Sequence, residues 1–313
     1  MHKIVILDDV TLTSAQQEVL RAAGTLDICR TIPADDEETL RRLNGADICI
    51  AGWTTLSEKV LRYLPSLRMI CLWATGTNCV DLNAARDLGI VVTNVPAYSA
   101  TAVAELCIGY MVALSRSLLA ADRHVRQGEY AWQEFKGSQL EGKVLGIIGL
   151  GSIGMRLSRM ARCMGMQVIA RTQYPSLNRA REAGVEFKGS LEALMEESDF
   201  LSLNCALTPQ TQNLIDDAAL SHLRPSAFLI NTARAGLINQ PALVTHLKSR
   251  TILGAALDDI DTVDPSATEL FQLDNVILSP HIGFHTTEAL IVVSDICVKN
   301  VLAFLRGDPI NVV

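Results

Sequence analysis

Short apolar runs alternate with amphipathic helical patterns along the first third of this chain. Each run has the length of a buried strand, whereas the segments between the runs repeat their apolar residues at a helical period. This alternation is typical of an α/β fold with a parallel sheet, because parallel strands are joined by helical crossovers. The predicted strands are residues 4–7, 26–29, 47–51, 69–73 and 90–93, and the predicted helices are residues 14–23, 37–43, 57–63 and 81–88.

A second set of alternating segments begins near residue 144. The same pattern indicates a second parallel sheet with helices between its strands. Its predicted strands are residues 144–148, 167–170, 185–187, 200–204, 227–231, 254–257 and 276–278, and its helices include residues 190–197, 216–222 and 240–249.

Two longer helices are expected outside these sheets. Pro96 interrupts the first set, and a long amphipathic helix is predicted over residues 101–127, as a connector between domains or a dimer face. A last helix is predicted over residues 287–306, and because it follows the second sheet we expect it to return to the first domain. The predicted domains are therefore residues 1–96 plus 286–313, and residues 97–285.

The strand over residues 144–148 runs directly into a glycine-rich turn, Gly149-Leu150-Gly151-Ser152-Ile153-Gly154, and then into a helix. Strand, glycine turn and helix in this order form the dinucleotide-binding fingerprint. Gly149 permits the tight turn, Gly151 lets the backbone approach a pyrophosphate, and Gly154 lets helix and strand pack closely. Ser152 and Ile153 open the helix, whose free N–H groups favour phosphate. The alternative is a plain buried strand, turn and helix.

Composition narrows the class of protein. The 313 residues are 49% hydrophobic and 19% charged, and the net charge is −7 with no basic run, which argues against nucleic acid or a membrane surface as partner. Eight scattered cysteines show no metal-ligand spacing, so no metal is expected and reduced thiols in a cytoplasmic protein are the natural interpretation. No signal peptide is apparent, and the most apolar helical stretch, 102–114, is too short to span a bilayer.

Four motifs in order resemble the D-isomer-specific 2-hydroxyacid dehydrogenase family over nearly the whole chain. They are residues 72–81 (LWATGTNCVD), residues 89–96 (GIVVTNVP) followed by Val103-Ala104-Glu105, residues 231–234 (NTAR) and residues 279–283 (SPHIG). Residues 74–86 (ATGTNCVDLNAAR) and 92–99 (VTNVPAYS) are most similar to the glycerate dehydrogenase and hydroxypyruvate/glyoxylate reductase branch. The resemblance implies two Rossmann-like domains, with the first binding substrate and the second binding the coenzyme.

The resemblance also implies the main catalytic roles. His281 follows the strand at 276–278, at the sheet edge where α/β proteins place ligands, and an imidazolium there can protonate a ketone oxygen during hydride transfer. Arg234 can grip a substrate carboxylate through two bonds and polarise the adjacent carbonyl. Each residue also has a structural interpretation, because most histidines and arginines are not catalytic.

Further site residues are carried over from the family pattern. The amide groups of Ala74, Thr75 and Gly76 are expected to bind the substrate carboxylate. Asp258 is expected to hydrogen-bond the nicotinamide carboxamide, and the same pocket is expected to be lined by Cys205, Thr232 and Ala233.

The carboxylate partner of His281 is ambiguous in the sequence. The family has a Glu just before a Pro, whereas this chain has Asp264 before Pro265 and a loop that is one residue longer. We expect Asp264 to be the partner, with Asp261 as the alternative and a solvated acidic loop as the remaining one. A neighbouring carboxylate would favour the protonated imidazole.

The coenzyme preference is read from the end of the strand at 167–170. An NAD site usually carries an acidic residue about 20 residues beyond the glycines, but this chain has Arg171 and Thr172 there. These residues can bind a 2′-phosphate without repulsion, so NADP(H) is favoured and NAD(H) remains possible.

The sequence therefore predicts an NAD(P)H-dependent reductase that interconverts small 2-keto acids, glyoxylate or hydroxypyruvate, with D-2-hydroxy acids, and that forms a homodimer. The alternatives are a different 2-keto acid or phosphoglycerate as substrate, or a non-catalytic nicotinamide-sensing protein that resembles a corepressor.

Overall fold

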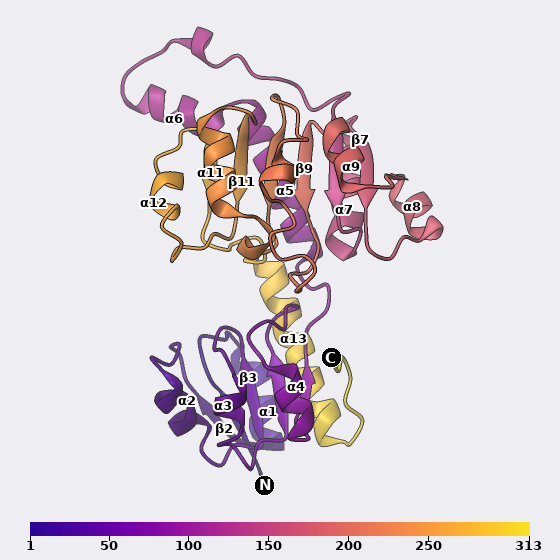
Figure 1. Ribbon diagram of the computed structural model, residues 1–313. Helices are drawn as coiled ribbons and strands as arrows, with labels where there is room; N and C mark the ends of the chain where they lie inside the picture. The colour runs from indigo at the N-terminus through magenta and orange to yellow at the C-terminus, as the bar shows by residue number, and fades with distance from the viewer. The chain divides into compact units, whose positions relative to one another are not determined.

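The computed structural model describes residues 1–313 and divides them into two compact units, each built on one sheet (Figure 1). Unit 1 comprises Met1–Tyr98 and Thr286–Val313, and unit 2 comprises Ser99–His285. The domain boundaries predicted from the sequence lie after residues 96 and 285. Every strand pair within the sheets is parallel, so the predicted α/β class with two parallel sheets is confirmed.

Unit 1 has a five-stranded sheet in the order β2-β1-β3-β4-β5. The order reverses between β1 and β3, which makes the carboxyl ends of these two strands a topological switch point. The strands are β1 (His2–Ile6), β2 (Gly24–Ile28), β3 (Ile48–Ala51), β4 (Met69–Leu72) and β5 (Val91–Thr93). The helices are α1 (Ser14–Ala23), α2 (Asp36–Leu43), α3 (Glu58–Leu61) and α4 (Leu82–Asp87). Because β3 and β4 are buried on both faces, they read as continuous apolar runs.

The last helix, α13 (Thr287–Leu305), belongs to unit 1 and packs against α1 and β4. Its Ser294 hydroxyl accepts from Trp73 Nε1 at 3.0 Å and donates to the Thr11 carbonyl at 2.7 Å. Asn300 Nδ2 donates to the Asn94 carbonyl at 2.9 Å. The predicted return of the C-terminal helix to the first domain is therefore confirmed.

Unit 2 has a seven-stranded sheet in the order β12-β11-β10-β9-β6-β7-β8. The order reverses between β6 and β9, as in a dinucleotide-binding fold. The strands are β6 (Val144–Ile148), β7 (Gln167–Arg171), β8 (Glu186–Phe187), β9 (Phe200–Leu203), β10 (Phe228–Asn231), β11 (Gly254–Leu257) and β12 (Val276–Leu278). The helices are α5 (Ala100–Ser115), α6 (Leu118–Arg126), α7 (Ser152–Cys163), α8 (Leu177–Ala183), α9 (Leu191–Glu197), α10 (Asp217–Leu220), α11 (Gln240–Lys248) and α12 (Ala267–Leu270), with 3-10 turns η1 (Trp132–Glu134) and η2 (Ala235–Leu237).

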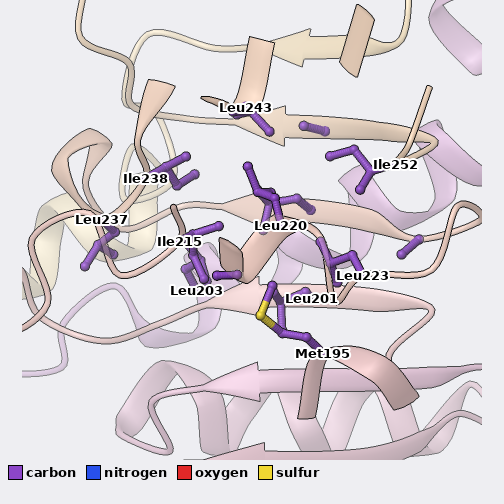
Figure 2. Packing of buried hydrophobic residues seen from close by; sticks show 14 of the residues in the cluster. Met195, Leu201, Leu203, Ile215, Leu220, Leu223, Leu237, Ile238, Leu243 and Ile252 are labelled. Carbon is purple, nitrogen blue, oxygen red and sulfur yellow. The ribbon is translucent and has the colours of Figure 1, made fainter. Parts of the chain in front are cut away.

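Apolar side chains fill both faces of this sheet. One cluster gathers residues of β9, β10, α9 and α11 and includes Leu201, Leu229 and Leu243, which are at most 1% exposed. Figure 2 shows side chains of this cluster converging between the strands and the helices. A second cluster packs α5 and α7 against the sheet through Met111, Leu157 and neighbouring side chains. Burial on both faces anchors the strands whose ends carry the predicted site residues.

The prediction of one continuous helix over residues 101–127 is wrong. The helix is broken into α5 and α6, which meet at an angle of 61°, and Ser117 between them has a left-handed backbone with φ +49°. The chain returns to this break, because Ser138 N donates to the Ser115 carbonyl at 3.0 Å, so tertiary contacts override the continuous pattern. No single helix is long and apolar enough to cross a membrane, although the bent pair reaches that length and hydropathy when its two parts are added together.

Candidate coenzyme and active site

The glycine turn after β6 has the geometry that its sequence predicts. Gly149 has φ +97°, and a Cβ added there would lie 2.6–2.7 Å from backbone atoms of Asn204 and Cys205. A Cβ on Gly154 would collide with the Gly149 carbonyl oxygen, so helix α7 could not pack as closely. These two glycines are therefore required by the fold itself, for conformation and for close approach.

Gly151 differs from both, since a Cβ there would meet no atom within 4 Å. It is the N-cap of α7 and makes no side-chain capping bond, and the exposed Ser152 and half-buried Ile153 follow it. An open position at an uncapped N-terminus of a 12-residue helix fits a phosphate cradle. The residues present thus fit a dinucleotide. The fold has space for a side chain at Gly151, so the lack of one would serve the close approach of a pyrophosphate.

Arg171 ends β7, next to this turn, and its carbonyl accepts from Gly149 N at 2.8 Å. Both Arg171 and Thr172 are partly exposed. Local hydrogen bonds and, to a lesser extent, the charge of Arg171 lower the pKa of the Glu192 carboxyl, so the guanidinium has an acidic neighbour on α9. At the carboxyl end of β7 the chain itself carries a cation and a hydroxyl, Arg171 and Thr172, and no acidic residue directly follows them.

Asn231, the last residue of β10, shapes the turn that carries Arg234. Asn231 Oδ1 accepts from Ala233 N at 3.0 Å, and its Nδ2 donates to the Arg234 carbonyl at 2.8 Å. Thr232 is 8% exposed and its hydroxyl lies 3.3 Å from Cys107 Sγ of α5. The Arg234 side chain is partly exposed and bonds only to the Ala233 carbonyl, at 2.7 Å. Most of its donors are therefore left for a ligand.

Asp258 follows β11 and organises the turn that carries His281. Its buried carboxylate accepts from the Ser279 hydroxyl, from Ile282 N at 2.9 Å and from Gly283 N at 2.7 Å, and its carbonyl accepts from His281 N at 2.7 Å. His281 has φ +56°, a left-handed conformation that is uncommon outside glycine. These bonds hold the strained residue in place, a role for Asp258 that the sequence did not predict.

Tyr110 of α5 extends this network. Because the Ser279 hydroxyl donates to Asp258, the Tyr110 hydroxyl donates to Ser279. Burial raises the pKa of the Tyr110 phenol to about 12, so the phenol keeps its proton. The sequence analysis placed Tyr110 only within a predicted helix and Ser279 only within the motif at residues 279–283.

The structure does not bring Asp264 or Asp261 to His281. The Asp264 carboxylate accepts from Ser266 N at 2.8 Å and from Ser266 Oγ at 2.7 Å, and these bonds lower its pKa. The Asp261 carboxylate accepts from the amides of Val263 and Asp264. The carboxylate beside His281 is Asp259, whose Oδ1 lies 3.8 Å from His281 Nδ1.

The thiols at this edge are not arranged for nucleophilic chemistry. Cys205 follows β9 closely and is partly buried, and burial raises its pKa. Burial also raises the pKa of Cys107 to about 11. All eight cysteines are free, and no group of three or more His, Cys, Asp or Glu side chains is arranged to hold a metal ion.

Unit 1 carries its own polar loops at the carboxyl ends of its strands. Val95 N donates to the Ala74 carbonyl at 2.9 Å, Asn94 Nδ2 donates to the Thr75 carbonyl at 2.7 Å, and the Thr75 hydroxyl donates to the Val95 carbonyl. These bonds hold the Ala74–Gly76 loop through its carbonyls and hydroxyl rather than through its amides.

Asp8 is a polar residue of unit 1 that the sequence interpretation missed. It lies just beyond β1 at the switch point and is 0% exposed. Its carboxylate accepts from the amides of Gly52, Trp53 and Thr54 and from the Thr54 hydroxyl, at 2.7–2.9 Å. It therefore fixes the loop after β3. A charged residue at the end of an apolar strand was the available signal.

A doubly wound parallel sheet with a glycine turn at its switch point defines a dinucleotide-binding protein, and the Arg234 and His281 turns at the same strand ends suit a dehydrogenase. Residues 108–283 match the model of the D-isomer specific 2-hydroxyacid dehydrogenase NAD binding domain. The chain belongs to the D-isomer-specific 2-hydroxyacid dehydrogenase family, whose members are oxidoreductases that use a nicotinamide coenzyme.

Curated relatives agree with this assignment. The chain is 37% identical to a glyoxylate reductase of Thermococcus litoralis, over 82% of this chain and 80% of that protein. It is 35% identical to a glycerate dehydrogenase of Methylorubrum extorquens, over 88% of each. A D-3-phosphoglycerate dehydrogenase of Methanocaldococcus jannaschii is 33% identical over 98% of this chain, but the chain spans only 58% of that relative.

Solved structures agree as well. An acyclic imino acid reductase in complex with NADPH and D-Arg superposes with a TM-score of 0.92, at 30% identity and over 99% of each chain. A glyoxylate reductase from Paecilomyes thermophila gives a TM-score of 0.91 at 25% identity, over 100% of this chain and 98% of that one.

Proposed function

We propose that this protein reduces small 2-keto acids to D-2-hydroxy acids, with glyoxylate and hydroxypyruvate as the leading substrates and NADPH as the preferred donor. The observation that carries the proposal is the placement of Arg234 and His281 at the ends of β10 and β12, on either side of β11, in the unit that carries the glycine turn. Relatives that share most of their length with this chain bear the names glyoxylate reductase and glycerate dehydrogenase.

The roles of the residues follow from their chemistry. The Arg234 fork binds the substrate carboxylate and polarises the adjacent carbonyl. His281 donates a proton to the carbonyl oxygen as negative charge develops there. When it is bound, the reduced nicotinamide supplies the hydride. Asp258 keeps the His281 turn in its strained conformation through its bonds to Ser279, Ile282 and Gly283.

The dinucleotide is proposed to lie at the N-terminus of α7, held by the turn from Gly149 to Gly154, with Cys205, Thr232 and Ala233 along its path. Support for NADPH comes from the partly exposed Arg171 and from Thr172 at the end of β7, where the sequence has no acidic residue. An NADPH-bound structure of similar fold is consistent with this preference. A charge-assisted hydrogen bond is worth about 1.5–3 kcal/mol, or roughly ten- to a hundredfold in affinity.

Other parts of the proposal stay predictions. Ala74, Thr75 and Gly76 of unit 1 are proposed to donate their amides to the substrate carboxylate, because the bonds of this loop engage its carbonyls and the Thr75 hydroxyl. A homodimer is proposed through α6 and the segment after it, where Leu118, Tyr130 and Trp132 are exposed. A cytoplasmic location is also predicted.

The test is a panel of keto acids assayed with both coenzymes at 340 nm. We expect glyoxylate and hydroxypyruvate to give the highest kcat/KM, and NADPH to exceed NADH by roughly tenfold or more. A preference for phosphohydroxypyruvate would transfer the assignment to phosphoglycerate chemistry. Coenzyme binding without turnover of any keto acid would favour a nicotinamide-sensing protein instead.

A further inference from the structure

We propose that Cys71 and Cys297 form an oxidisable dithiol in unit 1, which a peroxide closes into a disulfide that fixes α13 to β4. The inference goes beyond the proposed function, because it does not depend on the reaction that the protein catalyses. It joins the two chain segments of unit 1, since Cys71 lies in β4 and Cys297 lies in α13, 226 residues further along the chain.

The contact between the two side chains carries the inference. Cys71 Sγ lies 3.0 Å from Cys297 Sγ and 3.5 Å from the Cys297 carbonyl oxygen. The two sulfurs are therefore only about 1 Å further apart than the atoms of a disulfide bond. Both residues are 0% exposed, so the thiols face each other and not solvent.

The alternation of side chains along the sheet explains why Cys71 meets Cys297 and not the other buried thiol of unit 1, Cys49. Successive residues of a strand point to opposite faces. Ile70 and Leu72 of β4 pack with Cys49 of β3 in one apolar cluster. Cys71, which lies between them, points to the opposite face, where α13 packs against β4. Cys49 therefore points away from α13.

Polar contacts on either side of Cys297 hold α13 in its position along the sheet. Before Cys297, the Ser294 hydroxyl accepts from Trp73 Nε1 at 3.0 Å. After it, Asn300 Nδ2 donates to the Asn94 carbonyl at 2.9 Å. Because these bonds flank the thiol pair, the fold of unit 1 sets the approach of the two sulfurs, and closing the bond requires only a small movement of the side chains.

The reaction balances with hydrogen peroxide as the oxidant. One thiol, as its thiolate, attacks a peroxide oxygen, the O–O bond breaks, and a sulfenic acid and one water form. The second thiol attacks the sulfenic sulfur, the S–O bond breaks, and the S–S bond forms as a second water leaves. The two thiols together lose two protons and two electrons, and the peroxide is reduced to two waters.

The reduced pair is expected to react slowly while α13 is closed. The contact with Cys71, and then burial, raise the pKa of the Cys297 thiol well above its usual value, so little thiolate forms. The exposed Cys163 of α7 should therefore be oxidised first. Peroxide reaches the pair when α13 opens locally. When the helix closes again, the neighbouring thiol captures the sulfenic acid, and the disulfide then prevents further opening.

The experiment treats the reduced full-length protein with hydrogen peroxide, with and without urea below the unfolding midpoint, and digests the alkylated product without reductant. We expect mass spectrometry to find one dominant pair of linked peptides, which contain Cys71 and Cys297. On a denaturing gel without reductant, the closed chain should migrate faster than the reduced chain. Cys71→Ala and Cys297→Ala should lose the fast band, whereas Cys49→Ala, a matched buried control on the opposite face, should keep it.

Thermal unfolding tests whether the bond fixes the helix. We expect oxidation to raise the Tm of unit 1 by roughly 4 °C or more, reversibly with dithiothreitol, because a disulfide across a long loop restricts the unfolded chain. Cys71→Ala and Cys297→Ala should show no such reversible rise.

Two results overturn the proposal. The first is recovery of Cys71 and Cys297 as thiols or as separate sulfinic acids, or in the same mixture of links that the fully unfolded chain gives, because the fold would then not select this pair. The second is a linked pair without a rise in Tm, which would contradict the fixing of α13.

Discussion

The side chains proposed for catalysis at the edge of the unit 2 sheet are supported by buried polar neighbours. Asn231 holds both sides of the Arg234 turn through its two amide atoms. Asp258 accepts three bonds from the His281 turn and is 1% exposed. The Arg234 guanidinium itself bonds only to the Ala233 carbonyl, so most of its N–H donors stay available to a substrate carboxylate. Binding through two of these donors requires the planar shape of the guanidinium as well as its charge.

The first residue-level prediction is that Arg234→Lys lowers kcat/KM for the keto acid by roughly ten- to a hundredfold. Lysine keeps the charge but loses the planar fork that binds a carboxylate through two bonds, and such a bond is worth about 1.5–3 kcal/mol. Steady-state kinetics with saturating NADPH measures the change, and NADPH titration serves as the control for folding. A variant with wild-type kcat/KM would remove Arg234 from the site.

At the scale of elements, β6, the glycine turn and α7 form one unit whose glycines have different tasks. Gly149 and Gly154 are required by the protein, because a side chain there would collide with backbone atoms. Gly151 faces open space and is required only if a ligand approaches it. The same motif therefore contains two positions at which the fold needs glycine and one, Gly151, at which we propose that only binding needs it.

We accordingly expect Gly151→Ala and Gly149→Ala to fail in different assays. Gly151→Ala should keep the melting temperature and lose roughly tenfold or more in NADPH affinity. Gly149→Ala should lower the melting temperature, because φ +97° is strained for alanine by about 1–3 kcal/mol. Thermal unfolding and fluorescence titration distinguish the two, with Gly189→Ala as the control, since a Cβ there meets nothing within 4 Å. Unchanged NADPH binding by Gly151→Ala would place the pyrophosphate elsewhere.

At the scale of the whole molecule, the chain leaves unit 1 after Tyr98 and returns to it at Thr286. Helix α13 then supplies side chains to the unit 1 core, and Val293, Cys297 and Val301 are completely buried. Unit 2 is continuous in sequence and has two apolar clusters of its own. The core of unit 1 thus includes residues from the C-terminal helix, whereas unit 2 contains no residue beyond His285.

The corresponding prediction concerns a chain that ends at His285. Without α13, unit 1 loses the side chains that cover α1 and β4, and we expect it to lose its cooperative thermal transition. Unit 2 keeps its whole sheet, so NADPH should bind with an affinity within a few fold of the full-length protein. Calorimetry and fluorescence titration measure the two properties side by side. If NADPH binding disappears together with unit 1, the independence of unit 2 is refuted.

Local patterns were sufficient for much of this protein. The strand at 144–148, the glycine turn and the helix after it are read from neighbouring residues, because apolar period and glycine position are local properties. Arg234 and His281 were predicted differently, because residues 231–234 and 279–283 resemble motifs of the family, and each residue follows a predicted strand at the sheet edge. The break between α5 and α6 was missed, because the sequence around Ser117 has a continuous amphipathic pattern. The hydrogen bond from Ser138 N to the Ser115 carbonyl depends on a segment more than 20 residues further along the chain, which a local pattern does not include.

The order of apolar and polar residues by itself determined the two parallel sheets and the strands at whose ends the proposed site residues lie. Only the tertiary structure decided which of four nearby aspartates, Asp258, Asp259, Asp261 and Asp264, lies beside His281. That choice depends on the path of the loop after β11, which Gln240 fixes from a position 21 residues away in sequence. A residue's type and spacing are local, whereas its partners depend on which distant segments the fold brings beside it.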